Sequence, residues 1–448
     1  MRRMYDPRRV GSSGDPGREL VAVPAWRLVT RLVNVIVISL LHLLPTMLIG
    51  LAVRVRRGRA AAARYRYRRL ARLIQALGPT FVKFAQIAST RRDAMPAELC
   101  TALSVLHDAV APMSSKDRTR ALRRAIGDRR EEFAHVAEQP LASGSIACVY
   151  QSRLRDGRVV ALKLKRPGIE RSMAADLALL RLGVRLGERL PKLRGMPMAE
   201  LTGYISAAVL GQLDLLKEAD SLAQLRATLA SLPDVRVPAL VDQLSNPYCL
   251  VLEYVPELHR DTPRTLAPEI RSRLAATVLA AAHQLLFVEG LVHCDLHPGN
   301  VYLTPDAQVV ILDAGYTVRL PDDVRALIGE FFARMVAGDG RRCGEIVLAS
   351  AVRVNRETDT EGFIAGVAAL VERAAGSDNQ FDMPTFGEAM FDLQRDHGLY
   401  AASDFAFPLM SLLVLEGTVR GFDPDLDFQQ VGVGRKEFLA SSRKGAES

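Results

Sequence analysis

The feature that most constrains this chain is a short polar sequence set between apolar runs. It begins at Leu291, continues as Val-His-Cys-Asp-Leu-His-Pro-Gly, and ends at Asn300. A second acidic turn, Asp313-Ala314-Gly315, follows the apolar run 309–312. Asp, Asn, Pro and Gly are common in ordinary turns, but this order and spacing between apolar strands is far more specific than a turn. The pattern predicts two loops, each preceded by a buried strand, that bring carboxylate and amide oxygens together.

This layout is typical of a phosphoryl-transfer site. Asp295 would be the catalytic residue that accepts or orients the proton of the attacking hydroxyl. Asn300 and Asp313 would hold Mg²⁺ on the phosphates of a nucleotide such as ATP. Magnesium prefers hard oxygen ligands and usually takes only one or two from the protein, the rest coming from phosphate and water. The sequence therefore predicts ATP and Mg²⁺ as cofactors.

The charge balance agrees with an anionic ligand. The chain has 448 residues, a formal net charge of +9 and an isoelectric point near 9.5. Such a balance favours nucleotides, acidic lipids or nucleic acid. No basic cluster is interleaved with aromatic residues, so nucleic acid is not an expected partner. The five cysteines are scattered without a Cys-x-x-Cys pair, which predicts buried thiols in a reducing compartment.

The N-terminal part contains a possible membrane element. We expect a flexible arm over 1–24. The run 32–53 then has 22 residues without a charge, which is long enough for a helix to cross a bilayer. Arginines are more numerous after the run than before it, which would leave its C-terminal side cytoplasmic. Asn34, His42 and Pro45 weaken the pattern, so a helix lying in the interface or packed on the protein remains open.

Helices are expected for most of the next stretch. Residues 59–75 predict a basic helix, either resting on anionic lipid or facing solvent. A helix over about 81–89 would place Lys83 and Gln86 on one face. Further helical sequence covers 97–107, and the polar stretch to about Glu138 is also predicted to be helical.

Two strands with a tight turn are predicted next. Asp156-Gly157 separates two β-rich runs, which is a hairpin signal. The small residues Ala142, Ser143, Gly144 and Ser145 at the end of the first strand would let backbone amides approach phosphate. Lys163 lies on the second strand in a Val-Ala-Leu-Lys context, where a kinase lysine binds the α- and β-phosphates.

The predicted partner of Lys163 is an acidic residue on a helix. An unpaired ammonium in an apolar strand is costly, so Lys163 needs a carboxylate. Glu218 is that carboxylate, on a helix spanning about 208–229, with Asp214 one turn earlier on the same face.

The chain after this helix is predicted to form a strand and then helices. The apolar strand 248–256 would be a hinge whose backbone, at Glu253 and Val255, holds the adenine. A helix over 271–289, ended by Gly290, leads to the polar loop. The remaining helices are expected at about Asp323–Val336, Arg341–Leu348, Glu361–Arg373, Thr385–Arg395 and Pro408–Val419, with a polar tail over 436–448.

Taken in order, these motifs resemble the UbiB/AarF/ADCK family of atypical kinases, from about residue 69 to about 420. Lys83-Phe84-Ala85-Gln86 is similar to the family's Lys-x-Gly-Gln signature, and Ala142–Ser145 to its Ala-rich nucleotide loop, with Gly144 in place of one Ala. Gln212-Leu213-Asp214 stands where the family has Glu-x-Asp. Glu218 corresponds to the helix glutamate, and 293–300 and 313–315 to the catalytic loop and metal turn. Ala314 departs from protein kinases, which have Phe there.

The resemblance implies an α+β fold: a bilobal protein-kinase-like domain with a helical C-lobe and an N-terminal helical extension over the active site. In the family this extension leaves little room for a protein substrate, and Lys83 pairs with the first acid of Glu-x-Asp. Members bind membranes, act as ATPases or small-molecule kinases, and are linked to isoprenoid-quinone biosynthesis. Lys83, Gln86, Gln212 and Asp214 are therefore expected to form a regulatory extension. Gln212 could only hydrogen-bond Lys83, and Gly144 would make the nucleotide loop more flexible.

These expectations give a domain plan and three possible functions. The plan is a flexible arm (1–24), an apolar membrane-associated helix (25–58), a helical extension (59–137), an N-lobe (138–257), a C-lobe (258–435) and a tail (436–448). The first function is Mg²⁺-dependent transfer of the ATP γ-phosphoryl group to water or a lipid-like, quinone-precursor acceptor, in membrane lipid homeostasis or a lipid-biosynthetic complex. An aminoglycoside- or choline-type phosphotransferase and a non-catalytic nucleotide-binding scaffold are the alternatives.

Overall fold

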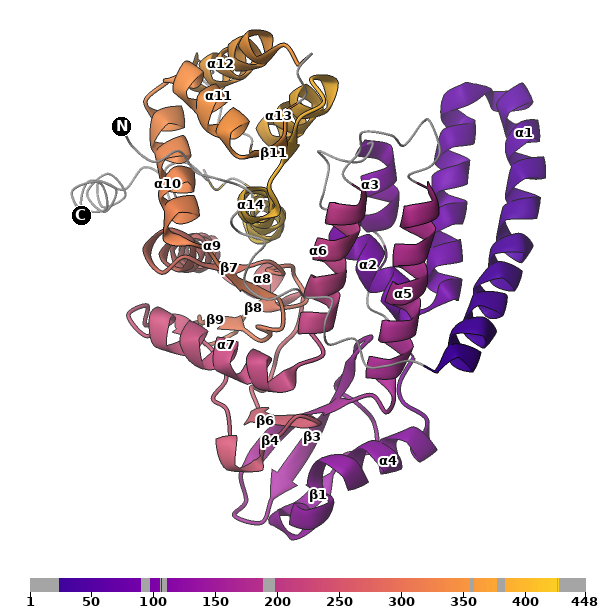
Figure 1. The fold of residues 1–448 in the computed structure, drawn as a ribbon. Coiled ribbons are helices and arrows are strands. Elements are labelled where there is room, and N and C mark those ends of the chain that lie inside the picture. The colour runs from indigo at the N-terminus through magenta and orange to yellow at the C-terminus, as the bar shows by residue number, and fades with distance from the viewer. Residues whose placement is uncertain are drawn as a thin grey trace. The chain divides into compact units, whose positions relative to one another are not determined.

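The structure is a computed structural model that describes residues 24–89, 97–104, 106, 111–187, 198–354, 358–376, 383–424 and 426. The chain divides into two compact units (Figure 1). Among the described residues, we call those up to Leu216, together with Val241–Glu253, the sheet unit. Lys217–Leu240 and the chain from Tyr254 onward form the loop unit. The predicted arm, apart from residue 24, and the predicted tail lie outside the described residues.

The sheet unit is built on an antiparallel sheet in the order β1-β3-β4-β6, with β2 paired to β3. Its strands are β1 Phe133–Val136, β2 Ala142–Ser143, β3 Ala147–Leu154, β4 Val159–Lys165 and β6 Cys249–Glu253. The predicted hairpin is confirmed, because β3 and β4 pair across a turn in which Gly157 has a φ of +90°. Helix α4, Ser115–Ile126, packs on this sheet through Ala121 and Ala125, which join Leu162 and Leu164 in one core.

The prediction of helix as far as Glu138 is wrong at its end. After α4 a short 3₁₀ turn, Gly127–Glu132, leads into β1, which pairs with β3. Phe133 and Val136 are buried while the two residues between them are exposed. This strand is too short for its own pattern to identify it, and its partner residues Ser152–Leu154 come later in the chain.

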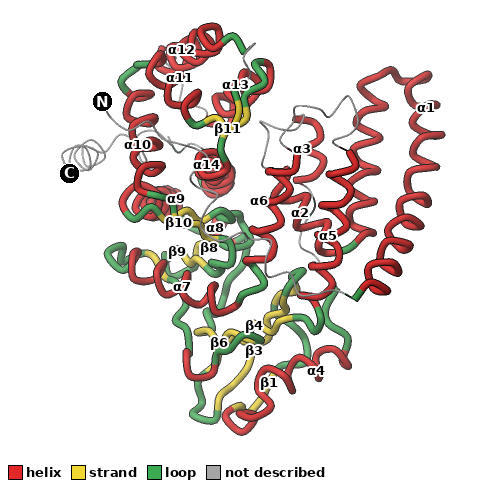
Figure 2. Tube along the Cα trace, viewed as in Figure 1, coloured by secondary structure: helices red, strands yellow, loops and turns green. Residues whose placement is uncertain are grey.

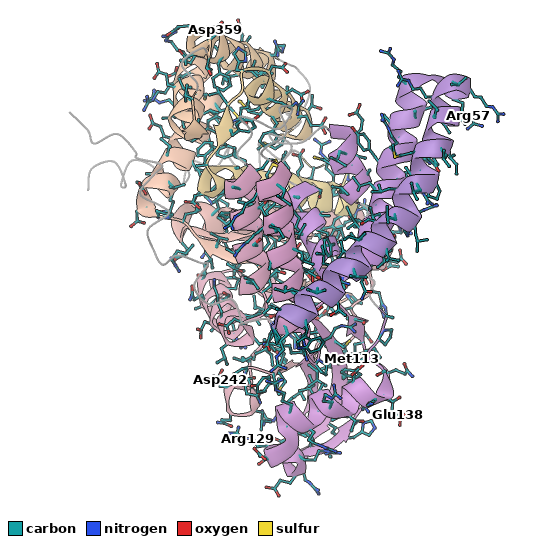
Figure 3. The ribbon with its side chains drawn as sticks, turned by 45° about the vertical axis from the view of Figure 1, so that its right-hand side comes forward. Arg57, Met113, Arg129, Glu138, Asp242 and Asp359 are labelled. Atoms are coloured by element: carbon teal, nitrogen blue, oxygen red, sulfur yellow. The ribbon has the colours of Figure 1, made fainter. Side chains whose placement is uncertain are left out.

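The N-terminal helix α1, Ala25–Leu77, is a hairpin of two helical arms that meet at Gly58 (Figure 2). Gly58 has a φ of +83° and a ψ of +177°, which no helix contains. Beyond it the chain runs back along the first arm: Arg69 Nε donates to Thr46 Oγ1 at 3.2 Å, and Arg31 contacts Leu77. The apolar run and the basic helix predicted separately are therefore the two arms of one hairpin, and Arg57 lies at its turn (Figure 3).

Four more helices complete the sheet unit. They are α2 Pro79–Ser89, α3 Ala97–Ser104, α5 Ile169–Gly187 and α6 Met198–Gly211. The predicted helix at 81–89 is confirmed as α2, and the helix predicted over 97–107 is shorter, ending at Ser104. The α1 hairpin is joined to α5 by Arg31, which forms an ion pair with the buried Asp176, with Nε 2.5 Å from Oδ1.

The single helix predicted over 208–229 is wrong. Helix α6 ends at Gly211 and α7 begins at Leu215, so Gln212-Leu213-Asp214 is a break between two helices. Asp214 Oδ1 accepts from the Leu216 amide at 3.0 Å, as a residue capping the start of a helix does. Asp214 therefore caps the start of α7 and is not inside the helix that carries Glu218.

The loop unit contains two small sheets around the polar loops. In one, β7 Leu291–His293 pairs antiparallel with β10 Thr317–Arg319. In the other, β9 Val309–Ile311 pairs with β8 Val301–Leu303 and, in parallel, with β5 Val235–Arg236. The predicted helix over 271–289 is confirmed as α9, Pro268–His283, which continues as a π turn to Val288 and stops before Gly290.

The rest of the loop unit is mostly helical, as predicted. It contains α7 Leu215–Leu229, α8 Thr262–Thr265, α10 Asp322–Val336, α11 Gly340–Ala349, α12 Thr360–Gly376, α13 Met383–Asp396 and α14 Ser403–Phe422. The sequence did not predict the small strand pair β11 Ala351–Arg353 and β12 Tyr400–Ala401.

Two of the described helices, α1 and α14, are long and apolar enough to cross a bilayer. Only 11% of the most apolar window of α1 is buried, against 61% for α14, so α14 fits a core helix.

Candidate active site

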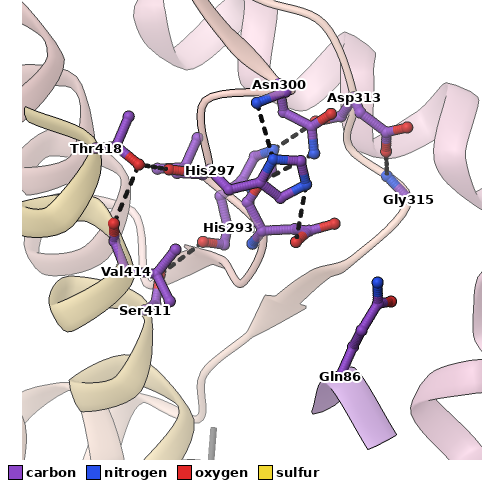
Figure 4. A network of polar contacts seen from close by, with 12 residues as sticks. Gln86, His293, His297, Asn300, Asp313, Gly315, Ser411, Val414 and Thr418 are labelled. Atoms are coloured by element: carbon purple, nitrogen blue, oxygen red, sulfur yellow. Dashed lines mark hydrogen bonds and ion pairs between the residues drawn. The ribbon is translucent and has the colours of Figure 1, made fainter. Parts of the chain in front are cut away.

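The polar loop predicted to be catalytic follows β7 directly. Leu291, Val292 and His293 are all buried, and β10 pairs beside them. The chain then turns through 294–300 and enters β8, which pairs with β9, the strand that leads to Asp313. Two short strand pairs thus bring the ends of β7 and β9 to the same place, as the apolar runs before each loop predict (Figure 4).

His293 links the two loops. Its ring is 3% exposed; Nδ1 accepts from the Asp295 amide at 3.2 Å, and Nε2 is hydrogen-bonded to the Asp313 carbonyl. Since Nδ1 is an acceptor, Nε2 carries the proton and donates it to that carbonyl. Burial lowers the pKa of His293 below its ordinary value, which outweighs the hydrogen bond to Asp313 and the nearby carboxylates. The ring is therefore neutral at pH 7, and its two hydrogen bonds join the loop that contains Asp295 to the turn that contains Asp313.

Asp295 is oriented by a second histidine. The Nε2 atom of His297 lies 3.5 Å from Asp295 Oδ1, while its Nδ1 accepts from the Gly299 amide at 2.8 Å. Because Nδ1 is an acceptor, Nε2 carries a hydrogen, and this nitrogen faces the carboxylate. Gly299 permits this arrangement, because a Cβ there would lie 2.5 Å from His297 Cε1. The Asp295 side chain keeps 29% of its surface exposed, so a substrate can reach it.

Asn300 and Asp313 fit the magnesium role. Asn300 Nδ2 donates to the Asp295 carbonyl at 2.9 Å, which turns the amide oxygen away from that bond. Asp313 Oδ1 accepts from the Gly315 amide at 2.7 Å, which fixes the carboxylate at the turn. The described residues contain no group of three or more His, Cys, Asp or Glu that could hold a metal ion. An amide oxygen plus a carboxylate is what Mg²⁺ needs when phosphates supply further ligands.

Glu218 lies beside the acidic turn. It is 3% exposed, and its Oε2 is 3.5 Å from the position that a Cβ on Gly315 would occupy. Glycine at 315 therefore lets two carboxylates approach the same turn. The predicted pairing of Glu218 with Lys163, a residue of the sheet unit, stays a prediction.

The predicted nucleotide-binding residues of the sheet unit occupy neighbouring strands. Ala142 of β2 pairs with Val149 of β3, which pairs with Lys163 of β4. Residues directly opposite one another in a sheet share a face, so Lys163 and the start of the small-residue loop lie on one face of the sheet.

The loop itself is tethered by an arginine that the sequence did not single out. Arg166 Nε donates to the Gly144 carbonyl and Nη2 to Ser143 Oγ, both at 2.9 Å. Ser145 is buried, and Glu253, the predicted hinge residue that precedes Val255, ends β6.

The predicted regulatory residues are buried in the helical part of the sheet unit. Lys83 and Gln212 are each 8% exposed. Gln86 Nε2 donates to the Leu106 carbonyl at 2.5 Å, which holds α2 against the segment after α3. The Gln212 side-chain nitrogen has no hydrogen-bond partner among the described residues. The regulatory role of these residues and their relation to the active site stay predictions.

Helix α14 donates hydrogen bonds to the loop that is predicted to be catalytic, and the sequence did not indicate these contacts. Ser411 Oγ donates to the His293 carbonyl at 2.6 Å, and Thr418 Oγ1 donates to the Leu296 carbonyl at 2.8 Å (Figure 4). These residues lie more than 100 positions after the loop, in an apolar helix with no motif of its own. The roles of His293 and His297, by contrast, could have been predicted from the sequence, because each lies two positions from Asp295.

Comparisons with known proteins identify the family of this chain. Residues 105–347, more than half of the chain, match the family model of the ABC1 atypical kinase-like domain. A curated relative named "Probable protein kinase UbiB", from Pseudomonas paraeruginosa, is 28% identical over 375 residues, which cover 80% of this chain and 69% of the relative. The protein of the same name from Pseudomonas putida strain W619 is 29% identical over 374 residues, covering 80% and 68%.

A solved structure shows the fold. It is the Rv3197–erythromycin complex from Mycobacterium tuberculosis, with a TM-score of 0.55 and 20% sequence identity, covering 78% of this chain and 90% of that one. The α+β kinase-like fold predicted from the motifs is confirmed. The chain therefore belongs to the ABC1 atypical kinase-like family, the UbiB/AarF/ADCK family that its motifs resemble.

Proposed function

We propose that this chain is an ATP-dependent phosphotransferase or ATPase that moves the γ-phosphoryl group to water or to a lipid-like small molecule. The observation that supports it most is the network of the catalytic loop. His293 joins the Asp295 amide to the Asp313 carbonyl, and Asn300 is bonded back to the Asp295 carbonyl. Three oxygen-bearing side chains are thereby held around one pair of loops, as phosphoryl transfer requires.

Each residue has a distinct task in this proposal. Asp295, oriented by His297, accepts the proton of the attacking hydroxyl. Asn300 and Asp313 would hold Mg²⁺, which when bound neutralises charge on the phosphate oxygens. Lys163 positions the α- and β-phosphates, with Glu218 as its partner. The amides of Ala142–Ser145 approach the phosphates, and the hinge at Glu253 and Val255 holds the adenine.

The test is ATP hydrolysis by the purified full chain with Mg²⁺, in the presence and absence of acidic liposomes and a quinone-precursor mimic. Asp295→Asn and Asp313→Asn should each lower turnover by roughly 100-fold or more, the range of a lost general base or metal ligand. Asp306→Asn is the matched control, because Asp306 is exposed in the β8–β9 turn and should change turnover by less than about twofold. Tight ATP binding with no hydrolysis by the wild type would instead indicate a non-catalytic scaffold.

We also propose that the chain is membrane-associated through the α1 hairpin, with the kinase-like part on the cytoplasmic side. The first arm of α1 exposes a continuous set of large apolar side chains. These are Trp26, Val29, Leu32, Val33, Ile36, Val37, Leu40, Leu41, Leu43, Leu44, Met47, Leu48, Ile49, Leu51 and Val55. A patch of this extent is unusual on a soluble surface and is typical of a membrane contact.

A membrane-bound kinase-like enzyme can reach an apolar acceptor that is dissolved in the bilayer. An isoprenoid or quinone precursor is the acceptor class that we propose, in a pathway of quinone biosynthesis or membrane lipid homeostasis. The link to isoprenoid-quinone biosynthesis that the motif resemblance implies supports this class, and stimulation of ATP turnover by the quinone-precursor mimic is the result expected from the assay above.

A further inference from the structure

A cleft of about 430 Å³ lies within the sheet unit, and none of the residues predicted to bind nucleotide lines it. Four segments surround it: the start of α1, one face of α4, the turn after β4, and the beginning of α5. Its lining consists of Arg27, Arg120, Ala121, Arg124, Lys165, Arg166, Pro167, Gly168, Glu170, Arg171 and Tyr248. A volume of this size accommodates a small ligand and falls within the range of ordinary ligand pockets.

The cleft is strongly positive. Six of its lining side chains are Arg or Lys and one is acidic, a formal excess of five positive charges. The single carboxylate is already used, because Lys165 Nζ lies 2.9 Å from Glu170 Oε1. Among the described residues, no carboxylate forms an ion pair with Arg27, Arg120, Arg124 or Arg171. Like charges repel one another when held together in a cleft, so this arrangement favours an anion between them.

Several of the cations are held in place before any ligand arrives. The Arg124 guanidinium lies 3.9 Å from the centre of the Tyr248 ring, a stacking contact that limits its rotation. Arg166 is fixed by its bonds to the Gly144 carbonyl and, at 2.7 Å, to the Ala111 carbonyl. Lys165 is only 8% exposed. The walls of the cleft are therefore ordered, which reduces the entropy lost on binding.

The chemistry of the lining identifies the class of ligand. Guanidinium groups bind phosphate through paired N–H donors, and several of them suit a group with two negative charges. The backbone adds to this, because Gly168, Glu170 and Arg171 line the cleft at the start of α5, where the first amides of a helix lack intrahelical acceptors. We propose that this cleft binds a phosphate monoester, presented either by a lipid headgroup or by a free phosphorylated metabolite.

The test compares two double variants of α4 that remove the same charge. Arg120→Gln/Arg124→Gln empties one wall of the cleft, while Lys116→Gln/Arg123→Gln removes two exposed cations of the same helix that do not line it. Binding of the full chain is measured by flotation with phosphatidylcholine vesicles containing phosphatidic acid. The increment over phosphatidylcholine alone is the quantity compared, since α1 contacts both kinds of vesicle. Calorimetric titration with glycerol 3-phosphate tests the free ligand.

The proposal predicts that the extra binding due to phosphatidic acid, or the affinity for glycerol 3-phosphate, is at least tenfold lower for the cleft variant than for the wild type. Each arginine near an anionic surface contributes roughly a fivefold factor. The control variant should change by less than about twofold. If the cleft variant loses binding only to the vesicles, the ligand is a lipid headgroup. If it loses binding to both the vesicles and glycerol 3-phosphate, the cleft recognises the phosphate group itself. Equal losses in the two variants, or no binding of either probe by the wild type, would overturn the proposal. Neither measurement needs ATP turnover, so its outcome is independent of the proposed catalysis.

Discussion

At the scale of single residues, the catalytic loop depends on a glycine that lets His297 reach its place. A Cβ on residue 299 would lie 2.5 Å from His297 Cε1 and 2.8 Å from Nδ1, closer than real atoms approach. Gly299→Ala should therefore displace the ring from Asp295. We expect ATP turnover to fall roughly 10- to 100-fold, since small misplacements of a catalytic group carry costs of this size. Steady-state hydrolysis assays would measure it.

A second glycine provides the control for this prediction. Gly329 lies within α10, and a Cβ there meets nothing within 4 Å. Gly329→Ala should leave turnover within about twofold and raise the free energy of unfolding by about 0.5–1 kcal/mol, because alanine favours the helix. Similar turnover in the two variants would mean that His297 does not orient Asp295.

The buried His293 makes stability depend on pH. Burial lowers the pKa of its ring in the folded protein, so the unfolded chain binds a proton at a higher pH than the folded chain does. The stabilisation is present above the ordinary histidine pKa of about 6.5 and is lost as pH falls below it. The free energy of unfolding should decrease from pH 7.5 to 5.5, with a contribution from His293 of at most about 1.4 kcal/mol per pH unit.

Denaturant titrations at several pH values would isolate this contribution. His293→Asn keeps a polar side chain but cannot titrate, so its stability should be lower throughout and its slope with pH shallower than that of the wild type. His135→Asn, at an exposed position of β1, is the matched control. Identical slopes in all three proteins would contradict a lowered pKa for His293.

At the scale of elements, the sequence predicted what short-range patterns determine. The loop 291–300, the acidic turn and the β3–β4 hairpin each depend on residues close together in the chain, and the structure contains all three. It did not predict β1, whose four residues become a strand only through pairing with β3. Nor did it predict the break before α7, because Gln212-Leu213-Asp214 has no Pro or Gly of its own.

The hydrogen bonds from α14 to the loop 294–300 and to His293 were the least predictable feature of the candidate site. Ser411 and Thr418 donate to loop carbonyls from α14, and nothing in an apolar helix distinguishes these hydroxyls from others. Their role follows only from which carbonyls tertiary packing places beside them, which is a property of the folded chain.

The α1 hairpin favours one of the two membrane arrangements that the sequence left open, a helix that spans the bilayer and a helix that lies in the interface. Its second arm packs along the apolar first arm, with Arg69 bonded to Thr46 and the Arg66 side chain beside Gly50. If the first arm crossed the bilayer as part of this hairpin, these arginines would enter the hydrocarbon. Each would cost about 2.5–3.5 kcal/mol on insertion scales. We therefore expect the hairpin to lie along the membrane surface.

Cysteine labelling in sealed proteoliposomes would measure this arrangement. Ala25→Cys and Arg57→Cys mark the two ends of the first arm, and Lys116→Cys marks α4. A membrane-impermeant maleimide added outside should label all three to the same extent if the hairpin lies in one interface. A spanning arm would place positions 25 and 57 on opposite sides. The native thiols contribute little, because four of the five are buried and burial raises the pKa of the fifth, Cys294.

At the scale of the whole molecule, the proposed function requires one nucleotide to be bound by residues that are far apart in the chain. Lys163 lies in β4, and Asp313 follows β9. MgATP at 100 times its dissociation constant should stabilise the wild type by about 2.7 kcal/mol, provided that it binds only the folded chain. Lys163→Met and Asp313→Asn should each reduce this increment, because each removes a contact to the same phosphates. Thermal melts with and without MgATP would measure the effect.

The double variant measures whether Lys163 and Asp313 bind the same nucleotide. Two residues that hold one ligand are coupled, so the increment lost by Lys163→Met/Asp313→Asn should be smaller than the sum of the two single losses. Lys116→Met in the sheet unit and Asp306→Asn in the loop unit remove the same charges from exposed positions and should keep the wild-type increment. If Lys163→Met kept it as well, Lys163 would not contact the nucleotide. Lys163 would then need another explanation for its place beside Val149 and Leu250 in the sheet.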